Sequence, residues 1–317
     1  MNEQLYNVSA NPHVRDKAST HSIMLDVIIA LLPATIFGFW NFGMKAVINT
    51  VLCILVCVVS EYAWQHFMHK KVTINDLSAV VTGLLLGMNL PPEVPYFIPV
   101  IGGVFAIIVV KQVFGGLGQN FMNPALGARC FLLISFAGIM TDFSYNGFGG
   151  SFDATTSATP LAALKAGEAV NLKAMFLGTT AGTIGETSAV LLLLGGLYLI
   201  ARKVISWKIP VCYIVTLGLF VLLFGGHGFD MTYLAEHLCG GGLMLGAFFM
   251  ATDYVTSPIT PKGQIVFGIL LGILTGIFRL FGGSAEGVSY AIIFCNLLVP
   301  LIEKFTTPAA FGKGGKK

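Results

Sequence analysis

The sequence predicts an all-α polytopic membrane protein with about ten transmembrane helices, arranged as two inverted five-helix repeats with both termini in the cytoplasm. The 317 residues are 55% hydrophobic and 10% charged, with a mean hydropathy of +0.82, whereas soluble domains carry about 25% charge. The apolar residues form long runs without polar alternation, which indicates helices and not barrel strands. Short glycine motifs recur in the same order in both halves. This composition excludes an ordinary cytosolic enzyme, a disordered tail and a nucleic-acid binder.

A helix crosses a bilayer with about 20 apolar residues. Two of the candidate spans, the third and the eighth, are short for a full crossing and have prolines at their ends. Short, proline-interrupted helices at matching places predict a binding site within the membrane, although proline can also fall at a helix end by chance. The ten candidates are His21–Trp40, Lys45–Trp64, Leu77–Leu90, Tyr96–Phe114, Ala125–Met140, Glu186–Arg202, Ile209–Phe224, Leu238–Ala251, Gln264–Leu280 and Val288–Ile302.

The internal repeat rests on two pairs of motifs. Gly83–Gly87 in the third span matches Gly242–Gly246 in the eighth, and the Phe-Gly-Gly at 114–116 after the fourth span matches that at 281–283 after the ninth. These pairs divide the chain into two halves of five helices. Because five is odd, the second half enters the membrane from the opposite side, as in many transport folds.

The distribution of basic residues predicts the orientation. With the N-terminus in the cytoplasm, 13 of the 18 Lys and Arg residues fall on the cytoplasmic side, as the positive-inside rule requires. The predicted division is a cytoplasmic segment 1–20, a first repeat 21–140, an outward loop 141–185, a second repeat 186–303 and a cytoplasmic tail 304–317.

The outward loop contains the segment Asp153-Ala-Thr-Thr-Ser157-Ala-Thr159, followed by Pro160. On composition alone, Asp and Thr here can simply cap a helix that starts near Pro160. The pattern Asp-x-x-Thr-Ser-Ala-Thr also resembles a flavinylation signal, in which the last threonine carries FMN through a phosphoester. That resemblance assigns the covalent flavin to Thr159.

Further motifs resemble one family over most of the chain, from Asn11 to Glu303. They resemble the RnfD subunits of Rnf complexes, which are ion-translocating ferredoxin:NAD oxidoreductases, and the related B subunit of the sodium-translocating NADH:quinone reductase. Tyr254 departs from the family, which usually has proline there, and this predicts a straighter end of the eighth helix. The motifs are Asn11–Arg15, Ala30–Ala34, Gly115–Ala125, Met250–Pro258 and Glu286–Ile293.

The resemblance implies a flavin-bearing electron-transfer subunit in the bacterial cytoplasmic (inner) membrane that is not catalytic alone. Electrons would pass between ferredoxin and NAD while sodium ions or protons cross the membrane. The other Rnf subunits would be its partners and would bind NAD and ferredoxin. The implied cofactors are FMN on Thr159, with Ser157 and Asp153 beside it on the outer face, and a second, non-covalent riboflavin.

The candidate residues for the second flavin lie in the Gly115–Asn123 turn. Asn120 and Asn123 can serve the polar edge of a flavin ring, because amides both donate and accept hydrogen bonds, and Gly116 and Gly118 permit close backbone approach. The alternative is an ordinary turn at a helix end.

Charged residues within the spans are the remaining candidates, because charge inside a membrane is costly. Arg129 could pair with a flavin phosphate or with Asp26, or form an ion pair of structural value only. Glu61 and Arg279 are expected to extend towards the headgroups. No metal site is expected, since the six cysteines form no CxxC motif. Two other functions stay open: a channel or secondary transporter without a redox role, and a purely structural membrane subunit.

Overall fold

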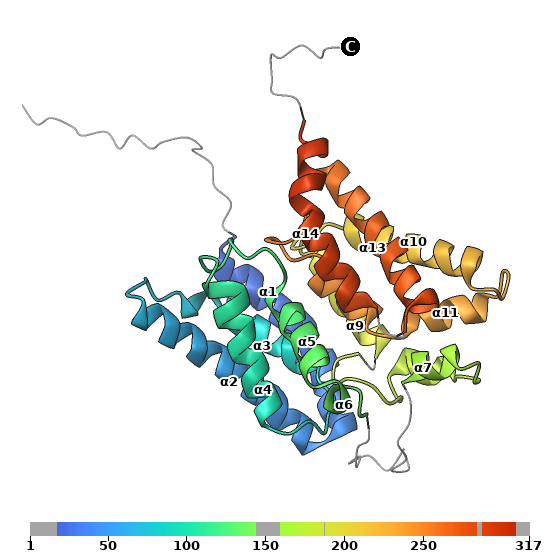
Figure 1. Ribbon diagram of the computed structural model, residues 1–317, viewed down its shortest axis with the longest axis horizontal. Helices are drawn as coiled ribbons and strands as arrows, with labels where there is room; N and C mark the ends of the chain where they lie inside the picture. The colour runs from blue at the N-terminus through green and yellow to red at the C-terminus, as the bar shows by residue number, and fades with distance from the viewer. Residues whose placement is uncertain (1–17, 144–158, 187, 284–286, 309–317) are drawn as a thin grey trace, which may run out of the picture.

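The computed structural model describes residues 18–143, 159–186, 188–283 and 287–308. Within these ranges every regular element is a helix (Figure 1), in agreement with the predicted all-α class. The helices are α1 (Thr20–Phe42), α2 (Met44–Phe67), α3 (Ser78–Met88), α4 (Phe97–Val104), α5 (Pro124–Ser135), α6 (Ala137–Met140), α7 (Pro160–Lys165), α8 (Leu172–Leu177), α9 (Ala189–Ala201), α10 (Lys208–Phe224), α11 (Met231–Cys239), α12 (Leu243–Leu245), α13 (Pro261–Phe281) and α14 (Val288–Thr306). A 3-10 turn, η1 (Ile74–Asp76), and two π-helical segments, η2 (Phe105–Gln112) and η3 (Gly246–Met250), complete the set.

Four helices, α1, α2, α13 and α14, are long and apolar enough to cross a membrane. Five shorter apolar helices accompany them, at 78–88, 97–112, 124–135, 189–201 and 208–224. Large apolar side chains cover their outer surface; Ile36, Trp40 and Leu223 are 62%, 77% and 70% exposed. Extended exposed apolar surface is typical of contact with lipid or protein partners. The chain is therefore an all-helical, multi-pass membrane protein.

Two predicted spans differ from the structure. The span predicted at Ala125–Met140 divides at Phe136 into α5 and α6. The span predicted at Leu238–Ala251 is not continuous, because α11 ends at Cys239 and α12 begins only at Leu243. Gly241 and Gly242 between them have φ angles of 65° and 64°. This left-handed conformation is open to glycine at little cost and ends a helix.

Glycines bring neighbouring helices of each half into close contact. A Cβ on Gly83 of α3 would lie 2.6 Å from Ile54 Cα of α2. In the second half, Gly268, Gly272 and Gly276 form one face of α13 that packs directly on α10. Small residues at such spacing allow tight packing in a membrane, where the hydrophobic effect does not drive helices together.

Helices from the N-terminal half of the chain contact helices from the C-terminal half. Figure 1 shows the helices α1–α5, in blue to green, beside α9–α14, in yellow to red. α1 contacts α9, and α5 contacts α14. Within each half, α3 packs on α5 as η3 packs on α14. α1, α3, α5, α9, η3 and α14 therefore lie where the two halves of the chain meet, and the candidate site lies there too.

Candidate functional site

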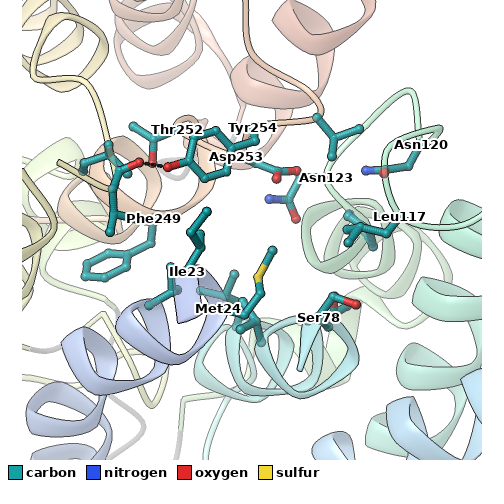
Figure 2. Close-up of a pocket in the computed structure, with 18 of the residues that line it drawn as sticks. Ile23, Met24, Ser78, Leu117, Asn120, Asn123, Phe249, Thr252, Asp253 and Tyr254 are labelled. Atoms are coloured by element: carbon teal, nitrogen blue, oxygen red, sulfur yellow. Dashed lines mark hydrogen bonds between the residues drawn. The ribbon is translucent and has the colours of Figure 1, made fainter. Parts of the chain in front are cut away.

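A cavity of about 80 Å³ lies where the two halves meet, and we call it the inner cavity (Figure 2). Side chains of α1, α3 and η2 contribute from the first half, and η3 with the segment after it contributes from the second. Ile23, Met24 and Ser78 face Asn123 and Asp253 across the cavity in Figure 2. Its polar lining residues are Ser78, Thr82, Lys111, Asn120, Asn123, Thr252 and Asp253.

Asn120 has an unused hydrogen-bonding atom at this cavity. Its side chain is 6% exposed, and its Nδ2 donates to Met122 O at 3.0 Å. Its Oδ1 meets no hydrogen-bond partner within the described residues. Because buried polar atoms in proteins are nearly always paired, this oxygen is suited to accept a hydrogen bond from a ligand.

Asn123 has a structural role at the same wall. Its Oδ1 accepts from Ala125 N and Leu126 N and so caps α5, and its Nδ2 donates to Met250 O at 3.4 Å. The helix-end alternative therefore holds for Asn123, although the residue also lines the cavity.

Gly116 and Gly118 shape the turn without forming the cavity wall. Their φ angles are 98° and 93°, a region that glycine adopts readily. Among the described residues, the turn contributes Leu117, Asn120 and Asn123 to the cavity lining and neither glycine. The glycines thus position Asn120 through the backbone.

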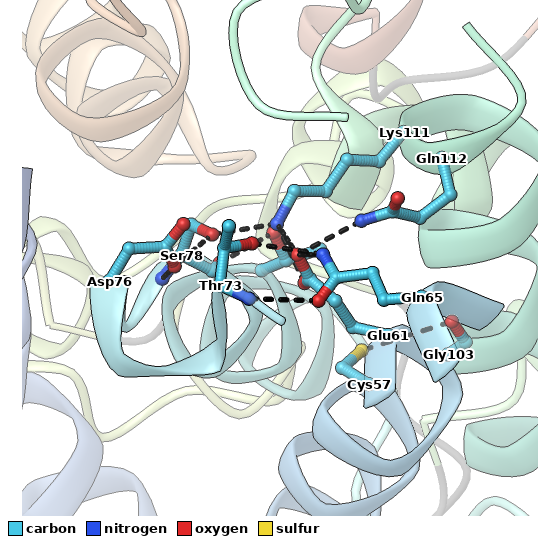
Figure 3. A network of polar contacts seen from close by, with 10 residues as sticks. Cys57, Glu61, Gln65, Thr73, Asp76, Ser78, Gly103, Lys111 and Gln112 are labelled. Atoms are coloured by element: carbon cyan, nitrogen blue, oxygen red, sulfur yellow. Dashed lines mark hydrogen bonds and ion pairs between the residues drawn. The ribbon is translucent and has the colours of Figure 1, made fainter. Parts of the chain in front are cut away.

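A buried ionic network adjoins the inner cavity (Figure 3). Lys111 Nζ donates to both Glu61 carboxylate oxygens, at 3.0 and 2.7 Å, and to Ser78 Oγ at 2.6 Å. Gln112 and Gln65 each donate to Glu61 Oε1, at 2.9 and 3.2 Å. The Lys111 and Glu61 side chains are 2% and 1% exposed.

The expectation that Glu61 extends to the headgroups is therefore wrong. Lys111 of η2 neutralises the Glu61 carboxylate inside the protein, where four hydrogen bonds replace water. Lys111, one of the 13 basic residues that the charge distribution assigns to the cytoplasmic side, lines the inner cavity.

The segment after η3 forms the opposite wall of the inner cavity. Asp253 is partly buried, and Thr256 Oγ1 donates to its Oδ2 at 3.1 Å. The Tyr254 hydroxyl donates to Val204 O, before α10. Because η3 ends at Met250, Tyr254 does not straighten the eighth helix as the sequence suggested.

Arg129 forms an ion pair across the boundary between the halves. Its Nη1 donates to Glu186 Oε1 at 2.7 Å and to Asn89 Oδ1 at 2.6 Å. Asp26 instead accepts from Arg202 Nη2 at 3.3 Å. The suggested Arg129–Asp26 pair is therefore wrong. The reason is that Glu186, before α9, packs against α5, whereas Asp26 lies on the α1 face that meets α9.

Thr159 is the N-cap of α7. Its Oγ accepts from Ala162 N at 3.4 Å, and Pro160 occupies the first helical position, so the capping interpretation is confirmed. Thr159 is 8% exposed, so its side chain is buried although the sequence predicts it in an outward loop. Asp153 and Ser157 lie outside the described residues.

A narrow space of about 30 Å³ adjoins Thr159, and we call it the tether cavity. Its lining includes Glu186, just before α9, and Gly240 and Gly241, between α11 and α12. Glu186 thus lines this space and also pairs with Arg129 across the boundary of the halves.

Arg279 is also buried, at 2% exposure, so the expectation that it reaches the headgroups is wrong. Its Nη1 donates to His237 O, and its Nη2 donates to Gly240 O at 2.8 Å and Gly241 O at 3.2 Å. These carbonyls are left without helical partners where α11 ends. The guanidinium satisfies them and holds the break between α11 and α12.

Comparisons with known proteins give one consistent result. The model of the NQR2, RnfD, RnfE family matches residues 7–312. One relative, a subunit of the Na(+)-translocating ferredoxin:NAD(+) oxidoreductase complex of Acetobacterium woodii, is 50% identical over 98% of this chain and 97% of its own. The corresponding subunit of the proton-translocating complex of Clostridium ljungdahlii is 46% identical with the same coverage. A subunit of an ion-translocating oxidoreductase complex of Yersinia enterocolitica is 36% identical, over 96% of this chain and 98% of its own. This chain therefore belongs to the NQR2, RnfD, RnfE family.

Proposed function

We propose that this chain is the flavin-bearing membrane subunit of a complex that couples electron transfer between ferredoxin and NAD to ion translocation across the bacterial cytoplasmic membrane. The carrying observation is that relatives named as subunits of such complexes match almost end to end, at 50% and 46% identity. These two relatives are named for sodium ions and for protons, so the proposal covers both. The other subunits of the complex are its partners and provide the NAD and ferredoxin sites.

The first cofactor of this proposal is FMN, bound to Thr159 through a phosphoester. The Thr159 hydroxyl fits this attachment, because its hydrogen bond with Ala162 N, at 3.4 Å, is longer than the usual 2.7–3.2 Å. FMN supplies electron transfer once bound, while Thr159 fixes where it is anchored and Glu186 lines the tether cavity. Since Thr159 is 8% exposed, the attaching enzyme reaches it before α7 packs.

Covalent attachment is tested on a denaturing gel. The band should fluoresce under ultraviolet light, because a phosphoester survives denaturation. Thr159→Val removes the hydroxyl and keeps the side-chain shape, so fluorescence should vanish while the protein still inserts. Thr232→Val, at another threonine near a helix start, is the matched control and should stay fluorescent. A wild-type protein purified without colour would contradict the proposal and favour a purely structural membrane subunit.

The second cofactor is a non-covalent riboflavin in the inner cavity. The orphaned Oδ1 of Asn120 supports this, because the flavin N3–H can donate to it. The Gly116–Gly118 turn holds Asn120 at the wall, and Ser78 and Thr252 offer hydroxyl groups on other sides. These residues bind and orient the ring, and the surrounding apolar side chains exclude water.

Acid extraction of the purified complex tests the second site. It should release riboflavin, and Asn120→Leu should lower that yield while the Thr159 band stays fluorescent. Asn123→Ser removes the amide but keeps an oxygen for the α5 cap, and it should have the smaller effect. Asn75→Leu, on an exposed turn, is the control. Extraction that yields no riboflavin from the wild type would refute this part.

The inverted repeat and the outward position of α7 complete the proposal. The third helices of the halves begin alike, after Leu77 with φ 62° and Gly242 with φ 64°. Cysteines in place of the exposed Lys165 and Lys203 test the orientation. Lys165→Cys should react with a membrane-impermeant maleimide in intact cells, and Lys203→Cys should not. The reverse pattern would place Thr159 on the cytoplasmic side.

A further inference from the structure

A larger cavity lies beside the tether cavity, and its volume is about 240 Å³. We call it the outer cavity. Leu161 of α7 lines both spaces, two residues from Thr159. The tether cavity, at about 30 Å³, holds only a small group, since one water needs about 10–15 Å³. A flavin ring attached at Thr159 must therefore lie outside the tether cavity, and the outer cavity is directly adjacent.

His237 marks the outer cavity as a binding site. Its side chain lines the cavity and is 4% exposed. Neither of its ring nitrogens has a hydrogen-bond partner within the part of the chain that the structure describes. Two polar atoms without partners on one buried side chain are rare in native proteins. The nearby Arg279 guanidinium donates to the backbone carbonyl of His237 and not to its ring.

The chemistry of His237 fits the polar edge of a flavin. Burial, with Arg279 and His227 as further causes, lowers the pKa of His237 to about 3, so the ring is neutral and offers one donor and one acceptor. The pyrimidine edge of a flavin alternates carbonyl oxygens with an N–H group. A neutral imidazole can pair with either type of group on that edge.

The rest of the cavity wall suits a planar ring. Tyr233 lies between two histidines, stacked on His227 with centroids 4.2 Å apart and edge-on to His237 at 4.6 Å. Phe224 and Phe281 line the mouth and are 57% and 67% exposed. Aromatic rings at these separations provide stacked and edge-to-face contacts to another aromatic ring.

We propose that the outer cavity receives the isoalloxazine ring of the flavin tethered at Thr159, and that His237 makes the hydrogen bond that holds the polar edge of the ring. This inference rests on the proposed covalent FMN and adds where its ring lies. His237 is thus a binding residue for the ring, whereas Thr159 provides only the tether.

Collisional quenching of flavin emission by iodide tests the docking in the purified complex. Emission from the Thr159→Val complex is subtracted, so that only the tethered flavin is measured. His237→Phe keeps a ring of similar size and removes both nitrogens. The docked-to-undocked ratio should fall about fivefold, the effect of losing one ordinary hydrogen bond, and iodide quenching should rise. His237→Gln, which restores a donor and an acceptor, should recover part of the protection.

His66→Phe is the matched control, because His66 lies on the exposed face of α2. Folding is checked in the Thr159→Val background, where His237→Phe should not lower the thermal midpoint, since it removes atoms without partners. A fluorescent covalent band with equal iodide quenching in wild type and His237→Phe would overturn this inference and leave the proposed function intact. A wild-type protein without a covalent band would overturn both.

Discussion

The buried pair of Lys111 and Glu61 gives a stability prediction with a defined magnitude. Glu61→Gln keeps the size of the side chain but removes the charge opposite Lys111, whose side chain is 2% exposed. Removing one partner of a buried ion pair costs about 3–5 kcal/mol, because the other charge stays buried. For a chain of this size about 1 kcal/mol shifts the midpoint by about 2 °C, so we expect a loss of about 6–10 °C.

Two comparisons separate this effect from a general effect of mutation. The double variant Glu61→Leu, Lys111→Met removes both charges and should recover most of the lost stability, since apolar replacement of a whole buried pair is often neutral. Lys45→Met breaks the Lys45–Glu93 pair, whose side chains are 36% and 30% exposed. That exposed pair should contribute about 0–1 kcal/mol.

The assay is thermal unfolding of the purified protein in detergent, followed by its helical circular dichroism at low and high salt. The Lys45–Glu93 contribution should shrink with salt, whereas that of the buried pair should not, because screening acts mainly on exposed charges. A Glu61→Gln protein as stable as the wild type, or a double variant no more stable than Glu61→Gln, would refute the reasoning.

Three further predictions concern the boundary between the halves and the outer cavity. Gly195→Ala should cost about 1–3 kcal/mol and lower the thermal midpoint, because its Cβ would lie 2.3 Å from a carbonyl oxygen of α1, whereas Gly138→Ala meets no atom within 4 Å of the described chain and should be neutral. Arg129→Gln should cost about 3–5 kcal/mol by leaving Glu186 unpaired, and Arg129→Gln with Glu186→Gln should be milder in the same melt. The pKa of His237 is lowered to about 3, so the unfolded chain takes up a proton that the folded chain does not. The unfolding free energy of wild type minus that of His237→Phe should be constant above about pH 6.5 and fall by up to about 1.4 kcal/mol per pH unit below it. A difference that rises on acidification would contradict the lowered pKa.

The sequence predicted the long helices well and the interrupted ones poorly. α1, α2, α13 and α14 begin and end within a few residues of their predicted spans, because long apolar runs have one stable form in a bilayer. A hydropathy profile averages over short breaks, so the predicted span Leu238–Ala251 runs across the break at 240–242 between α11 and α12. The π-helical segments η2 and η3 have no signature in a hydropathy profile.

The candidate site was predicted where a residue's role is local and missed where it depends on a distant partner. Thr159 before Pro160 reads as a cap from its neighbours alone, and the structure confirms that cap. Glu61 and Lys111 lie 50 positions apart in the chain and Arg129 and Glu186 lie 57 apart. Only the packing of helices brings these charges together, so their pairing had no sequence signal.

The charges around the inner cavity favour an uncharged ligand over a phosphorylated one. Among the described residues that line the inner cavity, Lys111 is the cationic side chain. The Glu61 carboxylate already neutralises Lys111 at 2.7 Å. Asp253 on the opposite wall adds a carboxyl group, so Glu61, Lys111 and Asp253 together carry a formal charge of −1. Burying a phosphate dianion against that charge would cost several kcal/mol, whereas riboflavin carries no phosphate. In the proposed arrangement the FMN phosphate lies at Thr159, where a covalent bond and not a cationic pocket would hold it. The proposed division, FMN at Thr159 and riboflavin in the inner cavity, is thus consistent with Glu61 already neutralising Lys111 at the inner cavity.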